Sequence, residues 1–491
     1  MENPLYKTTL WQNYLDGAWQ QASDGKSMES LNPATGELVA QVPDSSKQDA
    51  RDAVMIAKKA FRSQDWAFAP EKRAQALYAW GNRLEAASEE LAQLLTAESG
   101  KPIREARYEV GRAISYLRYY AGAARTVYGR STALSSDSYS ILAREPVGVV
   151  AVIVPWNFPV TLLMRALAPA LAAGNTTVIK PAEETTAITL ACIRELHATA
   201  AFPPGVVNVV SGFGHVVGRQ LVEDPHTDMV SFTGGSDTGR EVMRVASETV
   251  KKVSLELGGK SANIIFDDAD LERALPFVIS GIFTNAGQLC TVGSRLLVQD
   301  TIQARVIDEV KCRAERLRVG NGRDEATQMG PLVSEVQLQR VSGYVNIGKQ
   351  EAQLITGGNR LTANGLEQGY FFAPTIFDNA PESSPIVQEE IFGPVLAVQP
   401  FHDEEEAVAL ANGTRYGLAA AVWSKNIDRA LRASRRLEAG TVWINSYNKL
   451  APEVETGGYK ESGIGRASGL EGLYDYTEIK HIYIETEGLR E

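Results

Sequence analysis

Cys290 is the residue whose surroundings best suit nucleophilic chemistry. It lies in Asn-Ala-Gly-Gln-Leu-Cys-Thr, residues 285–291, which predicts a turn between a helix and a strand. A thiol on a tight turn is exposed on one side and close to backbone amides, as a nucleophile has to be. The alternative is a buried cysteine that packs as a small apolar side chain. We expect that alternative for Cys192 and Cys312, which lie within amphipathic helical patterns.

The base that serves such a thiol is expected to be a carboxylate, because the five histidines lie away from the loop ends expected near Cys290. Glu256 is the candidate, in Leu-Glu-Leu-Gly-Gly-Lys at the end of an apolar stretch. Ligands bind at the carboxyl edge of a parallel sheet, and burial there raises the pKa of a glutamate towards that of a useful base. The alternative is a salt bridge from Glu256 to Lys252 or Lys260.

Asn157 is the candidate donor to an oxyanion. It lies in Pro-Trp-Asn-Phe-Pro, residues 155–159, directly after an apolar strand. The two prolines stiffen the loop, and a fixed carboxamide N–H suits a developing negative charge. The alternative is that Asn157 caps the helix expected to begin near Val160.

Three successive strand ends suit a dinucleotide, although each lacks the G-x-G-x-x-G fingerprint. The segment Phe232–Gly239 offers small residues and a helix N-terminus to a pyrophosphate. Lys180 and Glu183 follow another strand and suit the ribose hydroxyls of an adenosine. The Gly-Phe-Gly segment at 212–214 lets backbone approach an adenine. The alternative for each segment is an ordinary turn between a strand and a helix.

Alternating strands and helices must position these residues. The expected strands are 147–154, 176–180, 206–210, 229–233 and 251–257, and the expected helices between them are 162–173, 188–199, 216–222 and 239–245. This alternation predicts right-handed crossovers and a parallel sheet with helices on both faces.

A second alternating series predicts a second α/β domain, with expected strands at 262–266, 294–298, 395–401, 418–423 and 441–445 and a long helix at 302–317. The first 125 residues begin with a strand-rich piece at 12–19. Two expected helices follow, at 47–60 and 70–99. Two β-prone segments, 127–144 and 473–485, are isolated from both sheets in the sequence. They suit either pairing between subunits or an ordinary edge hairpin.

Length and composition agree with two large folded domains. The chain has 491 residues, more than one hydrophobic core usually spans, and its 44% hydrophobic and 22% charged residues exclude disordered, collagen-like and coiled-coil classes. The net charge of −11, without a long basic stretch, disfavours nucleic acid and anionic membrane as partners. A small molecule is the expected partner.

The remaining features indicate a cytoplasmic protein without a metal site. No apolar run reaches the roughly 18 residues of a membrane span, and residues 1–11 contain no basic and apolar leader. The three cysteines support neither a disulfide framework nor a cysteine-based zinc site.

The chain resembles the aldehyde dehydrogenase superfamily over essentially its whole length, through the ordered motifs PWNFP, KPAE, FTGG, LELGGK, NAGQLCT, EEIFGPV and GGYKESGIGR. The resemblance implies a Rossmann-like cofactor domain from residues 1–125 and 148–255 and a catalytic domain from 256–445. Residues 126–147 and 446–491 are then a bridging β-element, which usually gives homodimers or homotetramers.

The resemblance also implies residue roles. Cys290 is the nucleophile, Glu256 the base for thioester hydrolysis, and Asn157 the oxyanion donor together with the Cys290 amide. The implied reaction is a non-acylating aldehyde oxidation with NAD, or alternatively NADP, held by Trp156, Lys180, Glu183, Gly214, Phe232, Gly234, Ser236, Leu257, Glu390 and Phe392. One departure is Gly-Ser-Asp at 235–237, where many members have Ser-Thr-Glu, so Gly235 is expected to offer only backbone.

Two other functions compete with that interpretation. An acylating dehydrogenase would pass the acyl group to coenzyme A, but a hydrolytic base such as Glu256 would waste the thioester. A non-catalytic binding protein would keep only the fold, but every chemical position of the family is intact here.

Arg165 bears on the substrate. It lies eight residues after Asn157, which at about 100° per residue returns to within roughly 80° of the same helix face, so it is expected to face the substrate entrance. Succinic semialdehyde dehydrogenases carry an arginine at the matching place, and this favours a carboxylate-bearing semialdehyde. Tyr447, Glu453 and Glu455 favour aromatic or amino aldehydes instead. In a further alternative, Arg165 pairs with a neighbouring acid and only its stem packs.

Overall fold

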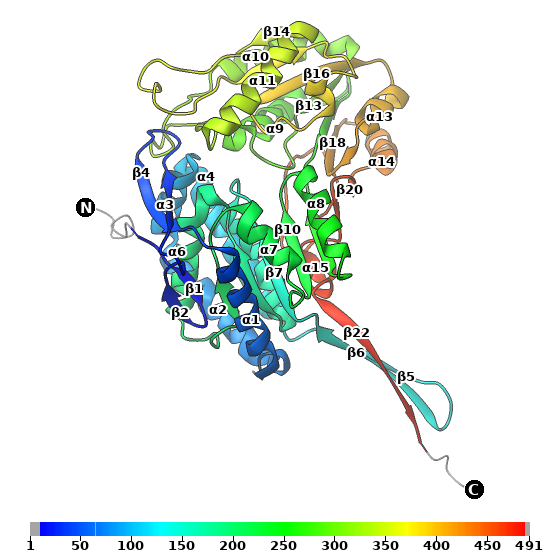
Figure 1. Ribbon diagram of the computed structural model, residues 1–491. Coiled ribbons are helices and arrows are strands. Elements are labelled where there is room, and N and C mark those ends of the chain that lie inside the picture. Colours follow the sequence, from blue (N-terminus) through cyan, green and yellow to red (C-terminus); the bar gives the residue numbers. More distant parts are fainter. Residues whose placement is uncertain (1–9, 64, 487–491) are drawn as a thin grey trace.

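Two lobes and one protruding arm make up the protein, as a computed structural model describes it for residues 10–63 and 65–486 (Figure 1). Each lobe is built around a mainly parallel sheet, so the predicted α/β class with two parallel-sheet domains is confirmed. Residues 1–9 and 487–491, which the predicted terminal segments include, lie outside the described residues. Within the described ranges, no helix has the length and apolarity that a membrane crossing requires.

The first lobe contains the sheet predicted around residues 147–257. Its order in the described chain is β2 (Ala18–Gln20), β1 (Asn13–Leu15), β9 (Val207–Val209), β8 (Thr176–Lys180), β7 (Val149–Ile153), β10 (Met229–Thr233), β11 (Lys252–Glu256) and β21 (Gly463–Ile464). The run from β9 to β11 is parallel throughout, and the outer strands β1, β2 and β21 are antiparallel. Parallel strand ends therefore meet at one edge of this sheet.

Helices cover both faces of this sheet, which is why its central strands are apolar at successive positions. Val149 and Ala151 pack with α1 (Lys47–Ser63), α7 (Arg219–Glu223) and α8 (Ser236–Ser247). Val150 and Val152 belong to the larger core formed with α2 (Pro70–Ala86), α3 (Ser88–Ser99), α4 (Ile103–Ala123), α5 (Pro159–Ala173) and α6 (Thr186–His197).

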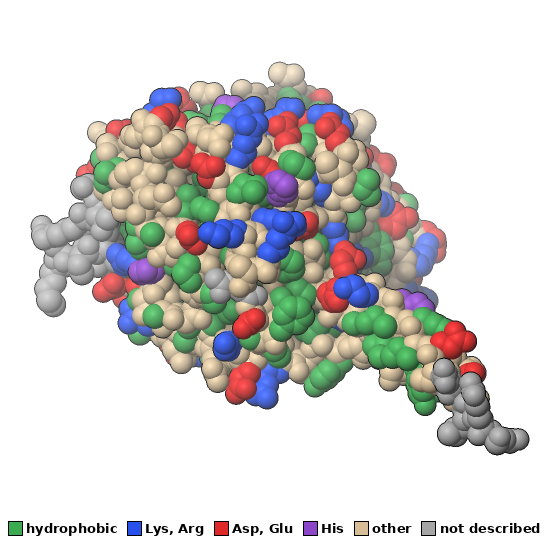
Figure 2. All heavy atoms as spheres, turned by 60° about the horizontal axis from the view of Figure 1, so that its bottom comes forward, with side chains coloured by type: hydrophobic (Ala, Val, Ile, Leu, Met, Phe, Trp, Pro, Cys, Tyr) green, Lys and Arg blue, Asp and Glu red, His purple; other side chains and the backbone are tan. Residues whose placement is uncertain are grey.

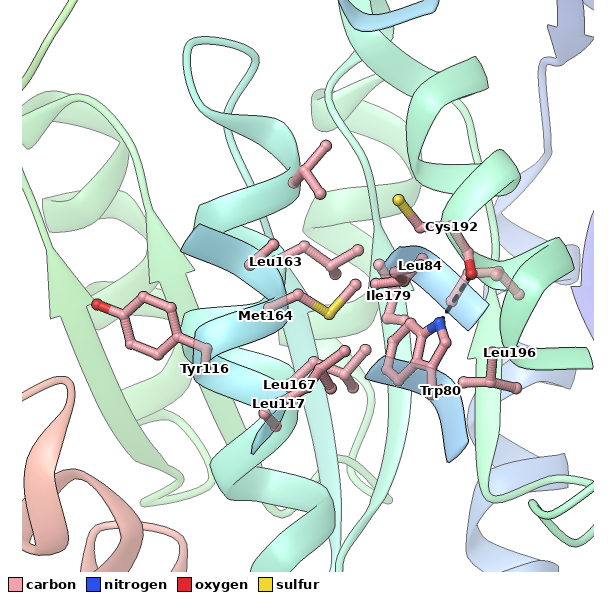
Figure 3. Packing of buried hydrophobic residues seen from close by; sticks show 14 of the residues in the cluster. Trp80, Leu84, Tyr116, Leu117, Leu163, Met164, Leu167, Ile179, Cys192 and Leu196 are labelled. Atoms are coloured by element: carbon pink, nitrogen blue, oxygen red, sulfur yellow. Dashed lines mark hydrogen bonds between the residues drawn. The ribbon is translucent and has the colours of Figure 1, made fainter. Parts of the chain in front are cut away.

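Cys192 lies in that larger core, as a small apolar side chain would (Figure 3). The indole N–H of Trp80 donates to the carbonyl oxygen of Cys192 at 3.0 Å and ties α2 to α6. Burial raises the pKa of the Cys192 thiol far above its ordinary value. Cys192 is therefore a buried cysteine that packs as a small apolar side chain, as expected for it from the sequence.

The second lobe contains the second predicted sheet. Its order in the described chain is β14 (Gln353–Thr356), β15 (Thr375–Asp378), β16 (Val395–Phe401), β13 (Arg295–Gln299), β12 (Ala262–Ile265), β18 (Ala419–Trp423) and β19 (Thr441–Ile444). All neighbours are parallel except β14, which is antiparallel to β15. The principal helices of this lobe are α9 (Leu271–Phe283), α10 (Gln303–Glu315), α11 (Glu335–Glu351), α13 (Glu404–Asn412) and α14 (Ile427–Arg436).

The two isolated β-prone segments pair with each other within the chain. β6 (Ser138–Pro146) runs antiparallel to β22 (Thr477–Glu485) over nine residue pairs, and β5 (Arg130–Ala133) adds to the other side of β6. These strands form the arm that projects from the first lobe in Figure 1.

Several expected elements have different bounds. The expected helix 70–99 is broken at Ala87, whose φ of −96° and ψ of 8° leave the helical region, so α2 and α3 are separate. The expected helix 216–222 begins as a wider π turn, Gly214–Gly218, before α7. The β-prone segment 473–485 begins inside α15 (Gly469–Tyr474), so its strand starts only at Thr477. The predicted domain boundaries stay a prediction, and β21, from the segment 446–491, adds to the first sheet.

Candidate active site

A cavity of about 510 Å³ contains the four residues expected at the reaction centre. Asn157, Arg165, Glu256 and Cys290 all line it. Its walls come from α4 and α5 of the first lobe and from the loops before β13 and after β19 of the second lobe. The structure thus brings Asn157 to the turn before Cys290, where Gln288 lies 131 positions later in the chain.

The turn before Cys290 has an unusual backbone. Asn285, Ala286 and Gly287 are all left-handed, with φ of 49°, 52° and 74°. A Cβ at Gly287 would lie 2.1 Å from the carbonyl oxygen of Gly393, so only glycine fits there. Asn and Gly tolerate this conformation, and alanine adopts it at a cost that the surrounding structure must offset. This strained turn connects α9 to β13 and places Cys290 on the cavity wall.

The Cys290 thiol is surrounded by groups with opposing effects. Burial raises its pKa to about 11, Arg165 lowers it, and Glu256 raises it. Within the described residues, the backbone N–H of Cys290 donates to no protein acceptor. That free amide leaves a donor available beside the sulfur, as an oxyanion requires.

Glu256 is the last residue of β11 and is buried, with only 10% of its side chain exposed. Burial raises its pKa above the ordinary glutamate value, and the nearby Arg165 opposes this shift. Its Oε1 atom is buried and accepts no hydrogen bond from the described residues. A carboxylate with a free oxygen and a raised pKa suits a general base. Within the described residues, Glu256 forms no ion pair with Lys252 or Lys260, the partners that the alternative expected.

Asn157 is not the cap of the following helix. The cap position of α5 is Phe158, and no side chain of its own caps that helix. The Asn157 Nδ2 atom instead donates to the carbonyl oxygen of Gln288, two residues before Cys290, at 3.0 Å. Because an amide nitrogen carries two hydrogens, the second remains available as a donor.

Arg165 forms the ion pair that one alternative anticipated, and its partner is Glu256. Its Nη2 atom lies 3.8 Å from Glu256 Oε2 and 3.5 Å from Thr233 Oγ1, and 11% of the side chain is exposed. Arg165 nevertheless lines the cavity, so its guanidinium can face both the carboxylate and a substrate. Its role in substrate binding stays a prediction.

Tyr447 lies behind the reaction centre. It is 2% exposed, and its hydroxyl donates to the carbonyl oxygen of Thr291 at 2.8 Å. Thr291 in turn donates from its hydroxyl to Asn448 Oδ1 at 2.9 Å. Tyr447 is not among the described residues that line the cavity, and neither are Glu453 and Glu455. Through these contacts Tyr447 supports the Cys290 loop from behind instead of lining the cavity.

The groups expected at the adenosine ribose meet at the carboxyl ends of β8 and β9. Lys180 Nζ lies 2.9 Å from Glu183 Oε2, and the amide of Gly214 donates to Glu183 Oε1 at 2.6 Å. The Glu183 side chain is 30% exposed, so its carboxylate is accessible from solvent. This arrangement fits a ligand with adjacent hydroxyl groups.

The glycine-rich turn after β10 leads into the N-terminus of α8. A Cβ at Gly235 would meet nothing within 4 Å, so backbone is open to a ligand there. Ser236 is buried, and its hydroxyl lies 3.5 Å from the carbonyl oxygen of Glu461. Phe232 fills the space beside Gly234, as Leu257 does beside Gly239. The helix end and open backbone fit a pyrophosphate, whereas a contact from the Ser236 hydroxyl stays a prediction.

The residues expected at the nicotinamide come from both lobes. The rings of Trp156 and Phe392 meet edge to face, with centroids 5.3 Å apart. Glu390 accepts a hydrogen bond from the Gly259 amide at 3.0 Å, and burial raises its pKa to about 7. A Cβ at Gly258 would lie 2.3 Å from the Glu390 carboxylate, which explains the glycine at this position.

Three charged residues that contact the site were not anticipated from the sequence. Glu105 and Glu109 lie four positions apart on one face of α4, and Lys101 extends this charged stripe from two positions before the helix begins. Such a stripe is typical of a solvated helix surface, but here it faces the Asn157 loop and the Cys290 turn. One sequence signal could have revealed this stripe. The apolar residues Ala106 and Val110, both buried, directly follow Glu105 and Glu109.

Comparisons with known proteins identify the family of the chain. The sequence pattern of the aldehyde dehydrogenase family matches residues 19–482. The chain is 43% identical to the betaine aldehyde dehydrogenase of Bacillus subtilis over 96% of this chain and 97% of that protein. The crystal structure of betaine aldehyde dehydrogenase from Staphylococcus aureus in complex with NAD⁺ is similar, with a TM-score of 0.97, 38% identity, and coverage of 98% of this chain and 96% of that one. On the match across nearly its whole length, this chain belongs to the aldehyde dehydrogenase family.

Proposed function

We propose that this protein oxidises an aldehyde to its carboxylic acid, with Cys290 as nucleophile, Asn157 as oxyanion donor and Glu256 as base. The observation that carries the proposal is their placement in one cavity, with a free amide beside the sulfur and a free oxygen on the carboxylate. The experiment is incubation of the wild-type protein with NAD⁺ and an aldehyde, followed by NADH absorbance and by detection of the acid. Formation of neither product would contradict the proposal.

The chain's own residues carry the covalent steps. The Cys290 thiolate adds to the aldehyde carbon, and the resulting oxyanion accepts hydrogen bonds from Asn157 Nδ2 and the Cys290 amide. The Lys180 and Glu183 pair, the turn before α8 and Glu390 with Phe392 would hold NAD⁺, which would supply the acceptor for the hydride that leaves this adduct as the thioester forms. Glu256 then takes a proton from water, the water attacks the thioester carbon, and the carboxylic acid leaves as the Cys290 sulfur is released.

NAD⁺ is the proposed cofactor. The Lys180 and Glu183 pair suits a ribose with free hydroxyls, the open turn before α8 suits the pyrophosphate, and Glu390 with Phe392 suits the nicotinamide ribose and ring. The Staphylococcus aureus enzyme with the same fold was crystallised with NAD⁺, which supports the proposal. A 2′-phosphate would bring like charge to Glu183, although Lys180 offsets part of that repulsion.

The substitution Glu183→Ser is expected to shift the ratio of kcat/KM values towards NADP⁺ by about fivefold or more. The reason is removal of a like-charge contact, which costs on the order of 1 kcal/mol in a partly buried site. Steady-state kinetics with both cofactors measure the ratio. Glu184→Ser, one position along and outside the Lys180 ion pair, is the matched control. Wild-type efficiency with NADP⁺ equal to that with NAD⁺ would overturn the expectation.

For the substrate, we propose an aldehyde that also carries a carboxylate. Three arginines line the cavity, Arg104, Arg112 and Arg165. Of the two glutamates that line it, Glu105 accepts a hydrogen bond from the Asn285 amide at 2.9 Å and Glu256 pairs with Arg165. The cavity wall therefore favours an anionic group on the substrate.

The aromatic residues of the same cavity argue in the same direction. A quaternary ammonium group is recognised on the open faces of aromatic rings. Here Arg112 stands 5.6 Å from the ring centre of Tyr116, and Lys101 stands 4.1 Å from that of Phe158. Because two of the three aromatic rings that line the cavity already carry a cation, with Tyr108 the third, a cationic aldehyde is the weaker candidate. A cationic aldehyde is nevertheless the alternative substrate, because similar proteins include betaine aldehyde dehydrogenases.

The substitution Arg165→Ala is expected to raise KM about tenfold or more for succinic semialdehyde, because a charge-assisted hydrogen bond contributes roughly 1.5–3 kcal/mol. Initial-rate kinetics with succinic semialdehyde, butanal, benzaldehyde and betaine aldehyde measure this. Butanal is the control, because it lacks the carboxylate and reports any general damage near Glu256 and Cys290. An equal change in KM for butanal, or a wild-type preference for betaine aldehyde, would contradict the proposed substrate.

We also propose that copies of the chain associate through the arm of β5, β6 and β22. Figure 2 shows apolar side chains gathered on it. Ile479, Ile482 and Tyr483 on β22 and Tyr139 on β6 are 58%, 42%, 53% and 47% exposed. An exposed edge with apolar side chains favours pairing with another chain. A monomeric mass of the wild-type protein in sedimentation would contradict association.

A further inference from the structure

The charged residues at the start of α4 have no part in the chemical steps, yet they are buried. Lys101 and Glu109 form an ion pair at 2.5 Å, and both side chains are 0% exposed. Replacing a buried ion pair by apolar or neutral residues of similar volume is often neutral for stability, because desolvation offsets the attraction. Stability alone therefore gives little reason to bury this pair beside a reaction centre.

Lys101 contacts the loop that carries the oxyanion donor. Its Nζ atom donates to the backbone carbonyl oxygen of Asn157 at 2.7 Å and lies over the ring of Phe158. The Asn157 carbonyl also accepts a hydrogen bond from Asn285 Nδ2 at 3.1 Å. Two donors from different segments thus fix the backbone of the residue whose side chain points to the Cys290 turn.

Glu109 holds the other end of the same loop. Its Oε1 atom accepts hydrogen bonds from the amides of Val160 and Thr161 at 2.8 Å and 3.2 Å, in the first turn of α5. Since α5 lacks a side-chain cap of its own, the Glu109 carboxylate supplies one from α4, where negative charge also suits the helix dipole. The ion pair therefore holds Asn157 from both sides.

We propose that Lys101 and Glu109 act as positioning residues for Asn157, so that its amide stays aimed at the developing oxyanion during attack by Cys290. This rests on the proposed function, in which Asn157 is the oxyanion donor. A misplacement of about 1 Å in such a group typically costs on the order of 100-fold in rate. The pair acts through the backbone of residue 157 and touches neither substrate nor sulfur.

The test is the paired substitution Lys101→Met with Glu109→Gln, which removes both charges and leaves an amide oxygen at position 109 that can accept from Val160. The expected result is a fall of about 10-fold to 100-fold in the rate of the first turnover, measured as NADH in stopped flow. KM for the aldehyde and the NAD⁺ affinity are expected to change by less than about threefold, because the substrate and cofactor contacts remain.

Lys58 and Asp228 provide a matched control. Lys58 Nζ lies 2.7 Å from Asp228 Oδ2, and that carboxylate accepts a hydrogen bond from the Val149 amide, so the chemistry resembles that of Lys101 and Glu109. This pair lies at the amino end of β7, away from the strand end that leads to Asn157. The substitution Lys58→Met with Asp228→Asn is expected to leave the first-turnover rate unchanged.

A double-mutant cycle with Asn157→Ala separates positioning from general damage. The backbone carbonyl of residue 157 survives in Asn157→Ala, but the amide that the pair positions is gone. The Lys101 and Glu109 substitutions are therefore expected to slow the first turnover by less than about threefold in that background. An equal fall in both backgrounds would overturn the proposal. Absence of aldehyde oxidation by the wild-type protein would instead contradict the proposed function itself.

Discussion

Replacing Cys290 by alanine is expected to reduce NADH formation by roughly 10⁴-fold or more, in the first turnover as well as in the steady state. The sulfur is the atom that bonds to the aldehyde carbon, and loss of a nucleophile cannot be offset by the remaining oxyanion donors and binding groups. Stopped-flow and steady-state assays with the best aldehyde of the panel measure both phases.

Cys312→Ala is the matched control for that experiment. Cys312 is a half-buried residue of α10, outside the described lining of the cavity, and its removal is expected to leave both phases intact. Tryptophan quenching by NAD⁺ checks that the cofactor still binds to Cys290→Ala. Aldehyde oxidation by Cys290→Ala at a rate within tenfold of wild type would reassign the nucleophile.

The strands of the first lobe could be predicted from the sequence because both faces of the sheet are buried. The expected strands 176–180 and 229–233 coincide with β8 and β10, whose residues are mostly β-branched or apolar and nearly all buried. Bounds were less accurate where local conformation decides them. At Ala87 a single residue leaves the helical region, and no glycine or proline in the sequence announces the break.

The reaction centre could be predicted in part, because parallel strands end at a common edge. This reasoning brings Glu256 and Asn157 together from β11 and β7, and the structure places both on one cavity wall. It could not foresee that Arg165 pairs with Glu256, since the side chain could equally have turned to another acid. It also missed Lys101 and Glu109, because their burial depends on α5 and on the Cys290 turn, which are distant from them in the sequence.

The substitution Glu256→Gln is expected to separate the two halves of the reaction. Loss of a general base typically lowers the reaction rate about 10²-fold to 10⁴-fold, and here the step that slows should be thioester hydrolysis. The first turnover should survive, because the Glu256 carboxylate raises the pKa of the Cys290 thiol and its removal therefore favours the thiolate. Arg165, which lowers the pKa of that thiol, remains in place.

Stopped flow should therefore record one equivalent of NADH per site. The steady-state rate that follows should be about 10²-fold to 10⁴-fold lower than that of the wild type. Glu453→Gln, an exposed residue of the loop after β19, makes the same chemical change outside the cavity lining and is expected to behave as wild type. Hydroxylamine provides an independent readout, because it attacks a thioester without needing a general base. It should restore turnover of Glu256→Gln and yield the hydroxamate.

Each departure from that pattern assigns Glu256 differently. Loss of the first NADH equivalent would mean that the carboxylate activates the thiol, and hydroxylamine would then restore nothing because no thioester forms. A normal steady state would mean that water is activated elsewhere, which would leave the free Oε1 atom of Glu256 without a catalytic purpose. A retained burst with hydroxylamine rescue locates the base after the thioester, where a buried carboxylate with a raised pKa can accept a proton from water.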